Sequence, residues 1–210
     1  MEFTVDVPGT YLLVDHSLTR SIDRGALGEL IVEGARNSEI FSAVNPDPNH
    51  SHADLAIWVE GKMFELSSEK YMVSEGSSDS DKETKPHLHD GNGLVIHRHK
   101  PEQSVGEFLE AIDIVATGRC ITLDNGTLVC NEGARRWQMF VNGTERPFNP
   151  SYVFADLDQI LLTYGATGEQ VIEQLQTLSD EACLYSQTCP ERGKPPVENC
   201  VADPTVPCTE

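Results

Sequence analysis

Six of the seven histidines in this 210-residue chain form three His-x-His pairs. The pairs are His50/His52, His87/His89 and His97/His99. Random placement of the histidines would give roughly 0.2 such pairs, so the clustering carries information. Residues two apart on a β-strand project from the same face of a sheet, and each pair can therefore offer two imidazoles to one ion. The spacing predicts a metal-binding protein.

The segment 87–99 has the turn residues of a β-hairpin. We expect a three-residue loop at 91–93, with Gly93 in the left-handed conformation, which sets His87 opposite His97. In that register all four imidazoles share one face, and the apolar residues between them point into the core. A two-residue Asn-Gly loop would shift the register by one and place the two pairs on opposite faces.

A cluster of this kind suits Cu²⁺, Zn²⁺ or Ni²⁺, all of which accept imidazole. The expected ligands are the histidines of the hairpin, with the pair on the preceding linker as optional partners: His87, His89, His97 and His99, then His50 and His52. Asp90 is expected to orient one of these histidines or to ligate directly. The alternative is a set of solvated histidines on a polar sheet face.

The order of predicted elements indicates a mainly β, α+β fold. Alternating apolar residues from Leu55 to Val59 predict a strand, and the segments 137–141 and 159–164 predict two more. Capping boxes at Ser104 and Thr167 predict the starts of two helices. This order weakly resembles that of β-grasp binding domains.

The charge balance excludes one class of partner. The net charge is −19, which makes nucleic acid an unsuitable partner because phosphate binding needs a basic surface. No run of about 18 apolar residues exists that would predict a membrane-spanning helix. We expect metal ions to be the ligands of this acidic chain.

The six cysteines predict disulfides and an extracytoplasmic protein, periplasmic or secreted. A three-residue loop between Cys120 and Cys130 would bring these two residues directly opposite each other, which makes them the expected first pair. The other four lie near or within a Pro-rich tail and allow three pairings, one of which is Cys183–Cys189 with Cys200–Cys208. Because no export signal opens the sequence, we expect the chain to be a fragment or a mature piece of a longer protein.

Several short segments near the N-terminus resemble copper-containing nitrite reductases, a family of two-cupredoxin multicopper proteins. The matching segments are Val7-Pro-Gly-Thr-Tyr, Leu13-Val-Asp-His-Ser-Leu, Arg24-Gly-Ala-Leu-Gly, Val32-Glu-Gly and Glu39-Ile-Phe-Ser. The resemblance implies that residues 1–42 are the end of the second cupredoxin β-sandwich. It also implies copper, oxidoreductase chemistry and a homotrimer for the parent protein. The family's type 1 copper ligands and most of its type 2 ligands lie in the other cupredoxin domain, so the resemblance brings no catalytic residue to this chain.

These observations divide the chain into four expected parts. A partial cupredoxin segment (1–42) is followed by a linker (43–53), an α+β metal-binding domain (54–182) with an acidic loop (74–86), and a Cys/Pro-rich tail (183–210).

Three functions remain open at this point. The leading hypothesis is an extracytoplasmic protein that binds copper, with zinc as the next choice. The second is a catalytic metal site in which water is activated and Asp90 acts as a base. The third is a binding or adhesion module whose histidines sense pH.

Overall fold

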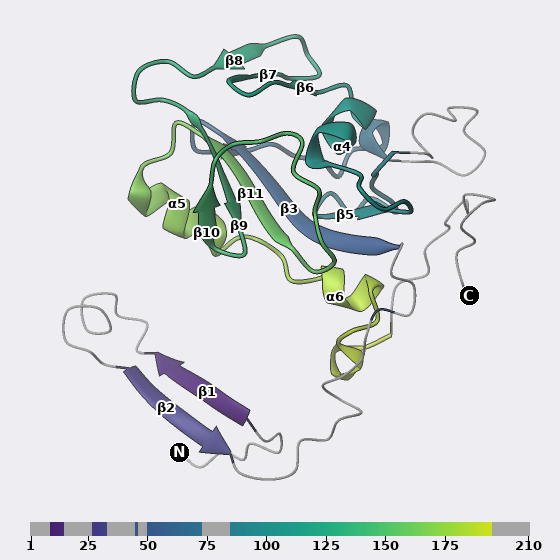
Figure 1. The fold of residues 1–210 in the computed structure, drawn as a ribbon, viewed down its shortest axis with the longest axis vertical. Helices are drawn as coiled ribbons and strands as arrows, with labels where there is room; N and C mark the ends of the chain where they lie inside the picture. The colour runs from purple at the N-terminus through teal and green to yellow at the C-terminus, as the bar shows by residue number, and fades with distance from the viewer. Residues whose placement is uncertain (1–8, 15–26, 33–44, 46–49, 73–84, 195–210) are drawn as a thin grey trace. The chain divides into compact units, whose positions relative to one another are not determined.

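The computed structural model describes residues 9–14, 27–32, 45, 50–72 and 85–194. Contacts divide the chain into two units, residues 1–43 and 44–210. In the first unit, strand β1 (Gly9–Val14) pairs antiparallel with strand β2 (Leu27–Val32) (Figure 1). The rest of the expected cupredoxin segment lies outside the described residues.

The second unit is built on a mixed six-stranded sheet. Five strands follow the order β10-β9-β11-β3-β4, and β5 pairs with the other end of β3. Strands β3 and β11 are parallel neighbours, and all other pairs in this sheet are antiparallel. The bounds are β3 (Ser51–Val59), β4 (Lys62–Met63), β5 (Val95–Arg98), β9 (Trp137–Val141), β10 (Thr144–Arg146) and β11 (Gln159–Tyr164).

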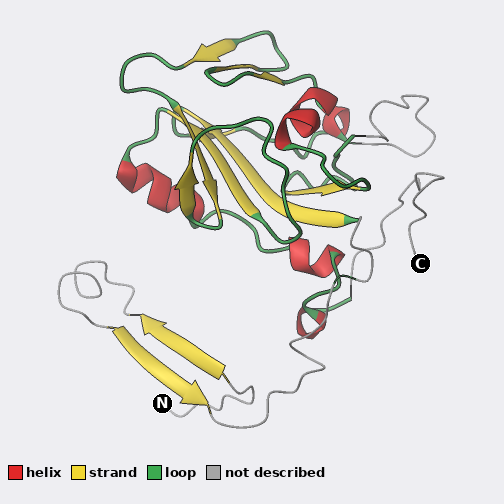
Figure 2. Ribbon diagram, viewed as in Figure 1, coloured by secondary structure: helices red, strands yellow, loops and turns green. Residues whose placement is uncertain are grey.

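In the part of the unit that the structure describes, three α-helices and a small second sheet accompany the large sheet. Figure 2 shows helices and strands in different colours. The helices are α4 (Val105–Ala111), α5 (Gly168–Leu175) and α6 (Ala182–Tyr185), with single 3₁₀ turns η1 (Glu69–Tyr71) and η2 (Pro190–Arg192). The small sheet contains β6 (Val115–Ala116), β7 (Cys120–Thr122) and β8 (Leu128–Cys130). None of the described helices is long and apolar enough to cross a membrane. The expected mainly β, α+β class is confirmed.

The two faces of β3 belong to different layers of the unit. Leu55 and Ile57 join the main core, in which they are buried together with Phe108 of α4. Ala56 points to the opposite face and packs in a smaller cluster with Val171 of α5. Because side chains alternate along a strand, helices α4 and α5 cover opposite faces of the sheet. His52 and Asp54 have the same parity as Ala56 and therefore share its face.

Both predicted capping boxes are confirmed. The Ser104 hydroxyl accepts from the backbone N–H of Glu107, and the Glu107 carboxylate accepts from the backbone N–H of Ser104 at 2.7 Å. Thr167 and Gln170 make the same reciprocal pair at the start of α5. These bonds satisfy N–H groups that the first turn of a helix cannot satisfy internally.

The hairpin that precedes strand β9 has the predicted register. Leu123 and Thr127 close a three-residue loop in which Gly126 is left-handed, at φ 82°. Cys120 then lies directly opposite Cys130, and the two form a disulfide.

The histidine hairpin has the predicted register but a different loop. His87 pairs with His97 through two backbone hydrogen bonds of 2.9 and 3.0 Å. The turn, however, runs from His89 to Asn92, with Asp90 at φ 53° and the following glycine, Gly91, at φ 74°. The expectation of a left-handed Gly93 was wrong.

Gly93 has a different structural role, which is close approach of two backbone segments. A Cβ atom at this position would lie 2.5 Å from the carbonyl carbon of Leu66 and 2.5 Å from the backbone nitrogen of Ser67. Only glycine lets the segment 92–94 run against that backbone without displacement.

Two expected boundaries need correction. Strand β3 begins at Ser51, and residues 51–53 are buried, so the last part of the expected linker belongs to the sheet. Helix α6 crosses the expected boundary between domain and tail at residues 182/183. The prolines at 46 and 48 favoured a linker in the sequence analysis, although the strand begins only three residues after the second proline. The expected acidic loop lies outside the described residues, apart from Lys85 and Pro86.

Replacement of Gly93 with alanine is expected to lower the free energy of unfolding by about 1–3 kcal/mol, because a backbone must move to admit the methyl group. Chemical denaturation measures the change. Gly118→Ala is the matched control, since a Cβ there meets nothing within 4 Å, and it should change stability by less than about 0.5 kcal/mol. Equal effects of the two substitutions would contradict the close-approach explanation.

Candidate metal centre

Three neighbouring strand segments place one histidine each in a single row. In the antiparallel pair β3–β5, His52 lies opposite His97. On the other side of β5, His97 lies opposite His87. Residues directly opposite in an antiparallel pair have Cβ atoms about 4.5–5.5 Å apart and project from the same face. His97 is therefore the middle member of the row.

The other three histidines extend this row on the same face. The β3–β5 register continues to His50 and His99, whose ring centroids are 4.5 Å apart and stacked. His89, two residues beyond His87, meets the ring of His97 edge-on with centroids 3.9 Å apart. All six predicted histidines are thus brought together.

Five of these six imidazoles are withdrawn from water. His87, His89, His97 and His99 are between 2% and 6% exposed, and His52 is 1% exposed. His50 is the exception and is half-buried. The alternative of solvated histidines on a polar sheet face is therefore wrong for the hairpin.

The imidazole nitrogens form two overlapping groups in the described part of the chain. One group is His87, His89, His97 and His99, and the other is His50, His52 and His97. Within each group, one nitrogen per residue lies within 4.8 Å of the others. Zn–N bonds of about 2.0–2.1 Å place tetrahedral ligand nitrogens about 3.3 Å apart. Side-chain rotations that move the nitrogens by about 1 Å would therefore bring the members of either group to ligand distance from one ion.

Two of the histidines have a defined tautomer. The Nδ1–H of His87 donates to the backbone carbonyl of Lys85 at 2.7 Å, because a carbonyl can only accept. His52 Nδ1 lies 2.8 Å from the Ser186 hydroxyl, which in turn donates to the Asp156 carboxylate at 2.5 Å. The hydroxyl group has one proton, which it donates to the Asp156 carboxylate. The Ser186 oxygen therefore accepts from His52, and the Nδ1 of His52 carries the proton. Both rings therefore carry the Nε2 lone pair that a metal requires.

Burial keeps His97 and His99 neutral near pH 7 in the metal-free protein. Desolvation, followed by the neighbouring histidines, holds the pKa of His97 well below its usual range. The same causes lower the pKa of His99 to about 3. Neutral imidazole is the form that binds metals, and a histidine that senses physiological pH would need a pKa near 6–7.

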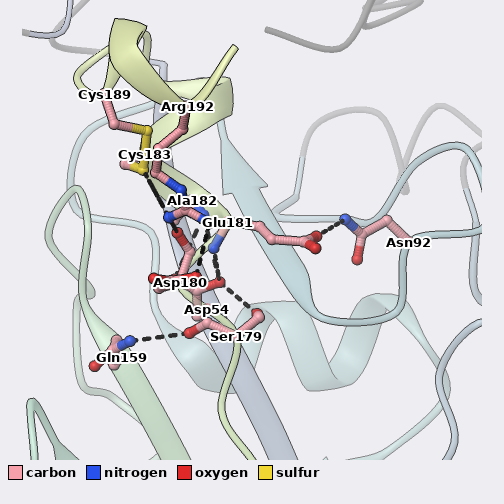
Figure 3. A network of polar contacts seen from close by, with 10 residues as sticks. All are labelled: Asp54, Asn92, Gln159, Ser179, Asp180, Glu181, Ala182, Cys183, Cys189 and Arg192. Carbon is pink, nitrogen blue, oxygen red and sulfur yellow. Dashed lines mark hydrogen bonds and ion pairs between the residues drawn. A yellow bond between two sulfur atoms is a disulfide. The ribbon is translucent and has the colours of Figure 1, made fainter. Parts of the chain in front are cut away.

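Asp54 attaches the C-terminal segment to strand β3 (Figure 3). Its Oδ1 accepts from the Ser179 hydroxyl at 2.5 Å and from the backbone N–H groups of Glu181 and Ala182 at 3.0 and 3.3 Å. Burial raises the pKa of this carboxyl, and the bond from Ser179 opposes that effect. The contact fixes the start of α6 two residues along β3 from His52.

Helix α6 and the residue after it cover the His52 end of the row. The Tyr185 ring lies 5.5 Å from the His52 ring, and Ser186, only 1% exposed, binds His52 as described. Asn92 of the histidine hairpin donates to the Tyr185 hydroxyl at 2.8 Å and to the Glu181 carboxylate at 3.2 Å. The disulfide Cys183–Cys189 closes the segment that contains Tyr185 and Ser186.

The predicted role of Asp90 is not supported by its position. Asp90 is exposed in the turn and belongs to neither histidine group of the described residues. Asp156 orients a histidine instead, through Ser186. Its Oδ1 also accepts from the backbone N–H of His52 at 2.9 Å. No local pattern marks Asp156 or Ser186, because they lie 104 and 134 residues from His52 in the sequence.

Four of the six cysteines lie in the part of the chain that the structure describes. The pairs Cys120–Cys130 and Cys183–Cys189 are disulfides. Cys200 and Cys208 lie outside the described residues, so their expected pairing stays a prediction.

Comparison with known proteins finds a short match to copper-containing nitrite reductases. The chain is 60% identical over 42 residues to the enzymes of Neisseria meningitidis serogroups A and B and of Neisseria gonorrhoeae. The match covers 20% of this chain and 11% of each relative. No family model matches the chain. No solved structure matches it either.

The metal-free protein should lose stability as the pH falls from 6.5 to 5. Unfolded His99 takes up a proton near pH 6.5, whereas the folded residue, with a pKa of about 3, does not. The unfolded state therefore binds more protons in this window, and for His99 alone the slope of the free energy of unfolding rises from about 0.7 kcal/mol per pH unit at pH 6.5 to about 1.4 near pH 5. Denaturation of chelator-treated protein at several pH values measures the slope. His99→Gln should give a shallower slope, and an unchanged slope would contradict the assignment.

Asp54→Ala is expected to destabilise the fold by about 1–3 kcal/mol, because three donors of the C-terminal segment lose their acceptor. Hydrogen exchange should show the loss concentrated in residues 179–186. Asp180→Ala serves as control, since this exposed carboxylate forms a surface ion pair with Arg192, and its loss should cost no more than about 1 kcal/mol. A uniform increase in exchange across the sheet would argue against a local attachment.

Proposed function

We propose that this protein binds a transition metal ion, copper by preference and zinc next, through His87, His89, His97 and His99. The single observation that carries the proposal is the buried group of four imidazoles whose ligand nitrogens lie within 4.8 Å of one another. Four buried imidazoles facing one another are most simply explained by an ion that all four share.

The donor set supports the choice of metals. Imidazole suits copper, zinc and nickel, and affinity for divalent ions follows an order in which Cu²⁺ exceeds Zn²⁺. The short nitrite reductase match adds weight to copper, although it covers only 42 residues.

Four protein ligands favour storage, delivery or structural stabilisation over catalysis. A tetrahedral ion bound by four histidines has no open position for water or substrate, whereas catalytic zinc sites keep one. Nitrite reduction is not part of the proposal for this chain, because the chain spans about a tenth of the length of the curated relatives it matches.

We place this function outside the cytoplasm, in a protein related to a copper oxidoreductase. The two disulfides support the compartment, since disulfides persist in oxidising environments. In that setting the histidine-rich unit is an accessory metal-binding module of the parent protein.

Metal titration of the purified chain tests the proposal. Cu²⁺ and Zn²⁺ should each bind with one equivalent per chain at micromolar concentration or below. The double variant His87→Ala/His97→Ala should bind at least about 100-fold more weakly, because it removes two of four ligands. Calorimetry with chelator competition gives both numbers.

The seventh histidine supplies the matched control. His16→Ala removes one imidazole from the sequence without changing the proposed ligand set and should leave the affinity unchanged. If the wild-type protein binds neither ion at micromolar concentration, the proposed function is wrong.

A further inference from the structure

The two histidine groups have one member in common. His97 belongs both to the group of four and to the group with His50 and His52. It lies between the other histidines on the central segment β5, with ring centroids 5.4 Å from His52 and 4.5 Å from His87. The groups are therefore two alternative positions along one row rather than two independent sites.

A neutral imidazole has one lone pair, so His97 can ligate one ion at a time. Imidazole binds a metal ion as a neutral ligand, and no carboxylate belongs to either group among the described residues. Two divalent ions a few ångströms apart would repel each other strongly without an anionic ligand between them. The chemistry favours a single ion that occupies one group or the other.

The two groups differ in their access to solvent. His50 is half-buried, whereas the four members of the inner group are at most 6% exposed. His50 also stacks on His99 of the inner group at 4.5 Å. An ion arriving from solvent thus meets His50 first and finds inner ligands directly beside it.

The outer group has an oriented second ligand. Ser186 and Asp156 hold the His52 ring with Nε2 as the ligating atom, as shown above. Support of this kind fixes a ligand in its binding orientation before the ion arrives.

We propose that a single metal ion enters through His50, His52 and His97 and then passes to the inner group by exchange of ligands around His97. This inference rests on the proposed function and adds its route and its stoichiometry. Release follows the same route in reverse. The outer group is an entry site with an open coordination position, and the inner group is the resting site.

Stopped-flow binding of Zn²⁺ or Cu²⁺, combined with equilibrium titration, tests the route. His50→Ala should slow association and dissociation by similar factors of several-fold, because the ion passes the outer group both when it enters and when it leaves. His89→Ala is the matched control: it removes a member of the inner group only, and should raise Kd by at least about tenfold through faster dissociation. His50→Asn repeats the first test with a side chain of closer size.

The outcomes separate this inference from the proposed function. Two ions bound per wild-type chain would overturn the single-ion route while leaving metal binding intact. Unchanged association in both His50 variants would also overturn it. Failure of the wild-type protein to bind either ion would instead remove the proposed function on which the route depends.

Discussion

The position of strand β5 between β3 and the segment 87–88 is the constraint on which the rest of the site depends. It sets Ile96 into the main core and, by alternation, turns His97 to the opposite face. The same pairing aligns His52 and His87 on either side of it. A slip of one residue would turn His97 into the apolar core and Ile96 toward the histidine face, so the core itself maintains the histidine row.

This arrangement combines an apolar layer with a polar one on a single thin sheet. On one side, β3 contributes Leu55 and Ile57 to a core that α4 covers. On the other, its first residues carry imidazole and carboxylate groups that helix α6 covers. The apolar layer supplies the burial that stabilises the unit, and the other layer can therefore retain polar side chains at the start of β3.

Local patterns in the sequence predicted the local structure well. Turn chemistry and alternation gave the opposition of His87 and His97 and the disulfide Cys120–Cys130. Capping boxes located both longer helices. The exact loop was not predicted, because a glycine can be required either by a left-handed conformation or by close approach of another backbone segment. Only the position of the Leu66–Ser67 backbone shows that Gly93 is the second case.

What depends on distant contacts could not be predicted. The parallel pairing of β3 with β11 joins residues about a hundred positions apart. The pairing of β3 with β5 brings His52 from the expected linker into the sheet, opposite His97. Proximity in sequence favoured Asp90 as a partner of the histidines, whereas Asp156, 104 residues from His52, accepts from the His52 backbone N–H. Register within a hairpin is a local property, whereas the support of a ligand depends on the assembled fold.

The parallel pairing of β3 with β11 also determines when the site is completed. Strand β3 appears early in synthesis, but its parallel neighbour ends at Tyr164 and the residue that holds His52 follows at Ser186. Parallel strands distant in sequence pair late in folding because a long loop must close first. A nascent chain therefore exposes His50 and His52 well before Ser186 can hold the His52 ring, and this end of the histidine row is covered only after nearly the whole unit has been synthesised.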